Sequence, residues 1–186
     1  MNKKDILPIG LIFIVIISRI IPHIPNWTPV ESIALFSGAY ILRNKLAYLI
    51  PILGIYLGDL ILNNTIYRTF YPSEEGMIWI SGYMIWTFLA MGGIIFLGSR
   101  LKTNLKPIKI IGFSFLGSVL FFVLSNFGVW LGSVIYPKSF LGLIECYTLA
   151  LPFFKNSLIS NLVFTMVLFG SMEYLLKPWF MKTQQA

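Results

Sequence analysis

Charged residues are scarce in this chain of 186 residues, where aspartate, glutamate, lysine and arginine together make up 11%. Soluble domains usually carry about 25% charged residues. The sequence therefore has too few charges for a surface that faces water on all sides. Hydrophobic residues make up 57% of the chain. We predict an integral membrane protein that forms a single domain over residues 1–186.

Residues that ligate metals or perform covalent catalysis are almost absent. One cysteine excludes an internal disulfide and any multi-cysteine zinc or iron–sulfur site, and one histidine excludes a histidine-rich metal site. The chain has no H-E-x-x-H, G-x-S-x-G or P-loop motif. We expect no enzymatic activity, no metal and no cofactor. The competing interpretation, a membrane enzyme, would need a titratable pair of side chains within a cavity.

Long apolar segments account for most of the chain. A bilayer core about 30 Å thick needs roughly 20 helical residues, and six segments approach that length: 6–22, 29–42, 46–62, 77–98, 107–132 and 156–176. The stretch 139–151, bounded by Pro137 and Pro152, is too short to span a membrane. We predict an all-α fold of six transmembrane helices, with a short re-entrant or interfacial helix between the fifth and the sixth.

The distribution of basic residues predicts the orientation of these helices. With the N-terminus in the cytoplasm, ten of the fourteen lysines and arginines fall on the inner side, as the positive-inside rule requires. Both basic termini then lie inside. The net charge of +7 is thereby explained as a topology signal, so we expect no nucleic-acid partner. We expect a multi-pass protein of a bacterial cytoplasmic (inner) membrane.

The second apolar segment is unusually short. Thr28, Pro29 and Glu31 match a capping box, which predicts a helix from Thr28 to Leu42. Such a helix is about 21 Å long at 1.5 Å per residue, less than the thickness of the bilayer core. Its outer end should lie below the membrane surface and leave a recess under the loop 22–28.

Polar residues gather in the outer halves of the predicted helices. Such residues usually face the interior of a bundle or a cavity, so we predict an outward-facing pocket. Its candidate substrate-binding residues are Arg19, His23, Trp27, Glu31, Asp59, Asn126, Trp130, Tyr136 and Asn161.

Most of these residues also have a purely structural interpretation. Arg19 could extend to the membrane interface or pair with Glu31 or Asp59. Glu31 could act mainly as a capping residue, and the two asparagines could join helices through hydrogen bonds. The tryptophans suit an aromatic belt. Gly54-xxx-Gly58 and Gly128-xxx-Gly132 favour close helix packing.

Four stretches carry a resemblance to a known family: "RIIPHIPNWTPVESIALFSGAY", "LIPILGIYLGDLIL", "LSNFGVWL" and the segment from Tyr136 to Gly170. They resemble uncharacterised bacterial transport proteins related to the substrate-binding (S) components of energy-coupling-factor (ECF) vitamin transporters. The resemblance covers nearly the whole chain. It implies a six-helix S-component-like bundle that captures a vitamin, a vitamin-like molecule or a corrinoid in an outward-facing pocket for uptake.

The chain departs from that family at the first helix. Typical S components carry a pair of small residues there, where the transmembrane subunit of the energising module docks, but this helix reads "GLIFIVIIS". An ECF-type module is the partner that the resemblance implies, and its docking motif is absent. Cys146 is the one candidate cobalt ligand if the substrate is a corrinoid. The alternative function is a structural or accessory subunit of a larger membrane complex, which would pack the same polar groups pairwise without a void.

Overall fold

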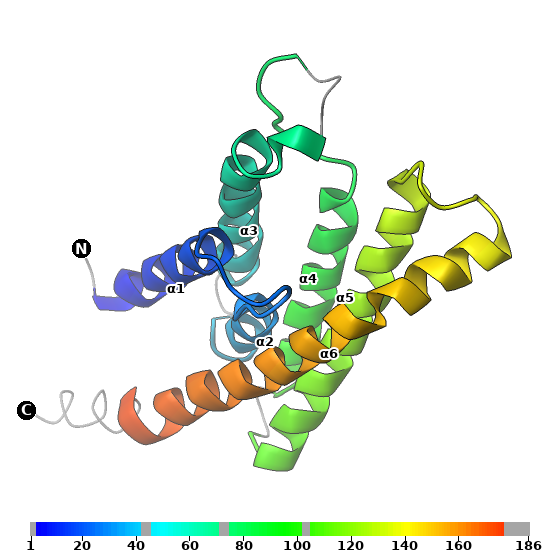
Figure 1. Ribbon diagram of the computed structural model, residues 1–186. Helices are drawn as coiled ribbons and strands as arrows, with labels where there is room; N and C mark the ends of the chain where they lie inside the picture. Colours follow the sequence, from blue (N-terminus) through cyan, green and yellow to red (C-terminus); the bar gives the residue numbers. More distant parts are fainter. Residues whose placement is uncertain (1–2, 42–45, 71–74, 102–104, 177–186) are drawn as a thin grey trace, which may run out of the picture.

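The computed structural model describes residues 3–41, 46–70, 75–101 and 105–176, and these residues form helices and connecting turns without any strand (Figure 1). The helices are α1 (Lys3–Ile20), α2 (Val30–Tyr40), α3 (Leu46–Asn64), α4 (Met84–Leu101), α5 (Pro107–Gly132) and α6 (Phe140–Ser171). A 3-10 turn, η1 (Arg68–Phe70), follows α3, and a π-helical turn, η2 (Met172–Leu176), continues α6. The prediction of an all-α protein is confirmed for this part of the chain.

Three helical segments are long and apolar enough to cross a membrane: Met84–Leu101, Pro107–Gly132 and Phe140–Tyr174. Shorter apolar helices run over Ile9–Ile20 and Tyr48–Asn64. Many large apolar side chains are exposed on these helices, among them Phe13, Ile85 and Phe115. Water would penalise such a surface and lipid would not, so the fold is compatible with a membrane protein.

The short helix α2 lies at the centre of the bundle, between the α1–α3 pair and the group α4, α5 and α6 (Figure 1). All its residues from Val30 to Ala39 are buried. Glycine makes this position possible. A Cβ atom at Gly38 would lie 2.0 Å from the carbonyl oxygen of Ile95, and one at Gly98 would lie 2.1 Å from that of Leu35. The backbones of α2 and α4 therefore touch at a point that no larger residue allows.

The helices alternate in direction, as their contacts show. α2 and α6 run in the same direction, because Glu31 near the start of α2 bonds to Ser157, and Tyr40 at the end of α2 bonds to Glu173, just after the end of α6. α5 and α6 run in opposite directions, and the same holds for α4 and α5. The pairs that establish this are Asn126–Cys146, Ser118–Asn161 and Ser114–Thr165 for α5 and α6, and Trp86–Gly128 and Gly93–Leu120 for α4 and α5.

Close contacts at two glycines show the relative direction of α1 and α3. Val15 packs against Gly54 and Arg19 against Gly58, so these two helices run in the same direction. Gly54-xxx-Gly58 is thus a close-packing motif, as predicted. At the other predicted motif, Gly128 packs against Trp86, whereas nothing lies within 4 Å of a Cβ built on Gly132.

The predicted interfacial helix between the fifth and sixth spans is wrong. Residues 139–151 form the first turns of α6, which continues through Pro152. Ser139 caps this helix, since its hydroxyl oxygen accepts from the backbone N–H of Gly142 at 3.2 Å. A proline inside an apolar helix removes one hydrogen bond but does not have to end the helix when neighbouring helices support it.

The fourth helix begins at Met84 rather than at residue 77. The side chain of Asn64 explains the difference. Its Oδ1 accepts from the backbone N–H of Ile78 at 2.8 Å, and its Nδ2 donates to the carbonyl oxygen of Ile78 at 2.9 Å. The backbone around Ile78 is therefore bonded to α3 instead of to a helical turn. Several basic residues on which the predicted orientation rests lie outside the described residues: Arg43, Lys45, Lys102, Lys177 and Lys182. Leu42, the predicted end of the second helix, lies outside them too.

Candidate functional site

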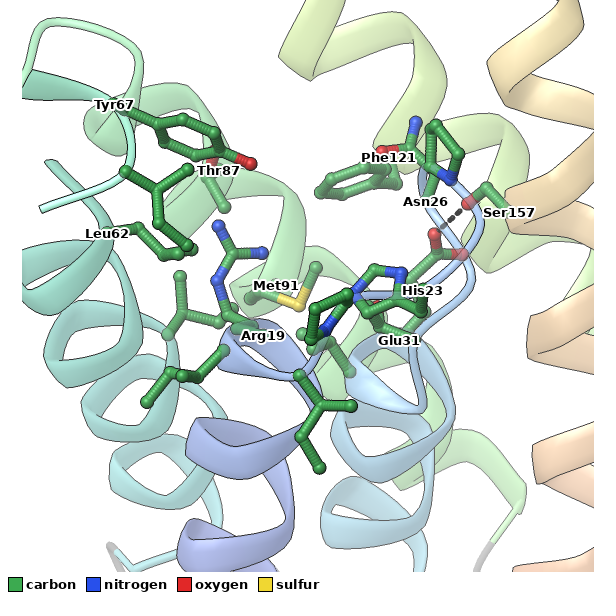
Figure 2. A pocket seen from close by; sticks show the side chains of 18 residues that line it. Arg19, His23, Asn26, Glu31, Leu62, Tyr67, Thr87, Met91, Phe121 and Ser157 are labelled. Atoms are coloured by element: carbon green, nitrogen blue, oxygen red, sulfur yellow. Dashed lines mark hydrogen bonds between the residues drawn. The ribbon is translucent and has the colours of Figure 1, made fainter. Parts of the chain in front are cut away.

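A cavity of about 450 Å³ lies where the C-terminal ends of α1 and α3 meet the N-terminal ends of α2 and α4, and α5 and α6 close its far side. Figure 2 shows Arg19, Leu62, Tyr67 and Thr87 on one side of it, and Glu31, Ser157, Asn26 and Phe121 on the other. A second cavity, of about 380 Å³, adjoins the first. The two share the lining residues Arg19, Pro25, Asn26, Thr87, Phe121 and Ser157.

An ion pair joins α1 to α3 at this site. The Arg19 guanidinium donates from its Nη2 to Oδ1 of Asp59. Gly58 permits the approach, because a Cβ there would lie 3.0 Å from the Arg19 Cδ atom. Oδ2 of Asp59 and Nε of Arg19 are buried without a hydrogen-bond partner among the described residues. Tyr83, which lines the second cavity beside Asp59, also interacts with this carboxylate.

Glu31 lies at the wall of the first cavity and joins three helices. The hydroxyl of Ser157 on α6 donates to its Oε1, as Figure 2 shows, and the hydroxyl of Ser118 on α5 donates to its Oε2 at 2.7 Å. The predicted capping box is wrong. The residue at the N-cap is Pro29, without a side-chain hydrogen bond. The tertiary partners of Glu31 take the carboxylate away from the backbone of its own first turn.

Behind Glu31, a chain of hydrogen bonds continues between α5 and α6. The side-chain nitrogen of Asn161 donates to the Ser118 hydroxyl oxygen and to the carbonyl oxygen of Ser114, both at 2.9 Å. The hydroxyl of Thr165 donates to Oδ1 of Asn161 at 3.2 Å. These groups are buried, and their bonds satisfy them. Asn161 thus joins helices and supports the Glu31 site from behind.

The loop after α1 covers the mouth of the cavity. Asn26 has a positive φ of 61°, a conformation that asparagine tolerates better than most residues. The loop is held to α6, because the side-chain nitrogen of Asn156 donates to the carbonyl oxygen of Pro25 at 3.1 Å and the Ser160 hydroxyl donates to that of Thr28 at 3.2 Å. His23, whose Nδ1 lies 2.7 Å from the carbonyl oxygen of Ile24, is exposed on the rim.

The structure brings together most of the predicted site residues, but not all of them. Arg19 lines both cavities, His23 and Glu31 line the first, and Asp59 and Asn126 line the second. Trp27, Trp130, Tyr136 and Asn161 line neither. The indole N–H of Trp130 instead donates to the carbonyl oxygen of Pro137 at 3.0 Å, so this ring belongs to the α5–α6 connection.

Sequence reasoning missed several lining residues. Ser157 is one turn before Asn161, a spacing that the sequence shows, and it contacts Glu31 directly. Thr87 is the one polar residue in the first two turns of α4 and lines both cavities. Asn26, Tyr67 and Phe121 carry no signal in the sequence that separates them from ordinary loop or bundle residues.

Cys146 does not line either cavity. It is buried, with 2% of its surface exposed, and its Sγ lies 3.5 Å from the carbonyl oxygen of Asn126. Within the described residues no group of three or more histidine, cysteine, aspartate or glutamate side chains could hold a metal ion.

A family model described as a family of unknown function (DUF6580) matches residues 1–184. Neither a curated protein nor a solved structure matches the chain.

Proposed function

The chain belongs to this family of unknown function, and we propose that it is a membrane carrier that takes up a small molecule through the cavity at Arg19, Glu31 and Asp59. In this proposal the fold is an S-component-like bundle of six transmembrane helices. Both termini are cytoplasmic, and the cavity faces outward across a bacterial cytoplasmic membrane. The ligand is a vitamin or vitamin-like molecule, and an ECF-type energising module remains the partner that the resemblance implies.

The cavity is the observation that carries this proposal. Small-molecule sites usually have volumes of about 300–1,000 Å³, with a few polar groups among apolar walls. Both cavities reach this range, at about 450 and 380 Å³. A scaffold that used its polar residues only to join helices would have no need of such a space beside them. Two buried atoms without a hydrogen-bond partner, Nε of Arg19 and Oδ2 of Asp59, also support a ligand site, since a ligand could bond to them.

The alternating helix directions support six crossings of the membrane. α1 and α3 end at the cavity where α2 and α4 begin, so α1, α3 and α5 run one way and α2, α4 and α6 run the other. In this proposal the short α2 is one of the six crossings. Its neighbours in the bundle bury its residues from Val30 to Ala39, so it does not need the length of a helix that faces lipid. The recess above its N-terminus is where the cavity lies, with His23 and Asn26 at the mouth.

The orientation is tested by labelling from one side of the membrane. In a Cys146→Ser background, His23→Cys should react with a membrane-impermeant maleimide on intact spheroplasts. Lys109→Cys, near the start of α5, should react only after the membrane is permeabilised. Both positions are exposed, so the reverse pattern would contradict the outward-facing cavity.

The carrier function is tested by uptake. The small molecule that purifies with the protein is identified by mass spectrometry, prepared in labelled form and supplied to cells that express each variant. Arg19→Ala and Asp59→Asn should each lower uptake about tenfold or more, because charge-assisted hydrogen bonds contribute about 1.5–3 kcal/mol. Glu145→Gln, at an exposed position on α6, serves as the matched control and should leave uptake unchanged. Full uptake by both cavity variants, at wild-type amounts of inserted protein, would show that the proposed site is wrong.

A further inference from the structure

Glu31 is a buried acid without a cationic partner in the described part of the chain. It is 6% exposed, and its two hydrogen-bond partners are serines. The nearest candidates to balance its charge are Arg19 and His23, which line the same cavity. Arg19 is paired with Asp59, and His23 lies on the exposed rim without an ion pair to Glu31. The lining residues from α3, α4, α5 and α6 carry no charge in this cavity: Ile55, Leu62, Thr87, Met91, Phe121 and Ser157.

The hydrogen bonds around Glu31 are arranged for the ionised carboxylate. Because the Asn161 amide already donates to the Ser118 hydroxyl oxygen, the hydroxyl hydrogen of Ser118 is directed at Oε2. Ser157 supplies a second donor, to Oε1. An ionised carboxylate is purely an acceptor, so both donors match it. Glu31 also lies in the first turn of α2, where the helix dipole favours an anion. Such an anion inside an apolar bundle is costly unless a positive charge lies nearby or a proton neutralises it, and a cationic ligand is a source of positive charge that this cavity can admit.

The walls of the cavities suit an organic cation. Phe121 and Tyr67 line the first cavity together with the thioether of Met91, and Phe122, Phe153 and Phe154 extend the second. Aromatic faces attract cations such as ammonium groups, and this is how proteins commonly hold quaternary amines. An inorganic ion would fill only a small part of about 450 Å³. The space and the rings together fit a charged nitrogen attached to an apolar body.

We propose that the ligand of this cavity is a small organic cation, an amine or quaternary ammonium compound, and that Glu31 is its counter-ion. Arg19 and Asp59 then hold each other's charge and offer hydrogen bonds to the rest of the molecule. This inference rests on the proposed function, because it names the chemical class of the molecule that the carrier binds.

The test uses three probes of one shape and different charge. Benzylammonium, benzyl alcohol and benzoate are titrated into the full-length protein in nanodiscs, and binding is followed by the shift in melting temperature and by equilibrium dialysis. Benzylammonium should bind and raise the melting temperature, while the neutral and anionic probes should bind at least tenfold more weakly. Glu31→Gln should weaken benzylammonium binding about 10- to 100-fold, which corresponds to the loss of one charge-assisted hydrogen bond. Glu145→Gln should bind like the wild type.

The comparison within the wild type keeps the test decisive if Glu31→Gln does not fold. Equal binding of benzyl alcohol or benzoate would overturn the inference, and so would a wild-type protein that does not respond to millimolar benzylammonium. An uncharged or anionic small molecule purified with the protein would overturn it too, while leaving the carrier function in place. If no small molecule binds at all, the proposed function fails together with the inference.

Discussion

Removing the charge of Arg19 should destabilise the protein more than removing the charge of Asp59. The Asp59 side chain is 1% exposed, whereas the Arg19 side chain is 24% exposed. Arg19→Gln leaves a buried carboxylate without its cation, and breaking a buried pair in this way costs about 3–5 kcal/mol. Asp59→Asn leaves a guanidinium that can turn toward the cavity and its water. We therefore expect it to cost only about 1–3 kcal/mol, the range for an unsatisfied polar group.

The free energy of unfolding of the two single variants and the double variant, measured in detergent micelles with increasing sodium dodecyl sulfate, tests this asymmetry. The double variant Arg19→Gln/Asp59→Asn should cost less than the sum of the single variants, since residues in contact couple by about 0.5–3 kcal/mol. Two results would refute the reasoning. One is an Asp59→Asn variant that is less stable than Arg19→Gln, and the other is additivity within about 0.5 kcal/mol.

Three further predictions concern packing and burial. Gly98→Ala should lower the free energy of unfolding by about 1–3 kcal/mol, because its Cβ would lie 2.1 Å from the carbonyl oxygen of Leu35. Gly112→Ala is the control, since nothing lies within 4 Å of its Cβ, and it should be neutral or slightly stabilising in the same assay. Asn161→Leu should cost about 0.6–2 kcal/mol, the range measured for hydrogen bonds between membrane helices, and a neutral result would argue against its joining role. Cys146, at 2% exposure, should resist a maleimide in the folded protein and react fully in sodium dodecyl sulfate; rapid labelling of the native protein would contradict its burial.

Two helices, α5 and α3, were predictable almost to their ends because their signals are local. The segment predicted at 107–132 is α5 itself, Pro107–Gly132, where proline occupies a first-turn position that suits it. The segment predicted at 46–62 differs from α3 by two residues at its end. Apolar composition, turn residues and the position of proline determined these helix ends, and all three can be identified within a single stretch of the sequence.

The features that were predicted wrongly depend on residues that are far away in the sequence. Glu31 matches a capping residue locally, but its actual partners, Ser118 and Ser157, lie 87 and 126 residues further along the chain. Proline usually ends a helix, and the prediction ended one before Pro152 for that reason. α6 nevertheless continues through Pro152, because the neighbouring helices of the bundle support it. Conversely, pairing of Arg19 with Asp59 was one of two pairings left open, and the structure selects it because α1 and α3 run in the same direction with Gly58 between them.

Native mass spectrometry of the protein, purified gently from its own membranes, tests the central claim most directly. We expect the wild-type chain to carry a bound small molecule, and we expect this mass to be lost or much reduced in Arg19→Ala and Asp59→Asn but kept in Glu145→Gln. A chain that carries no small molecule and instead holds a protein partner in fixed stoichiometry would contradict the account and favour an accessory subunit of a membrane complex.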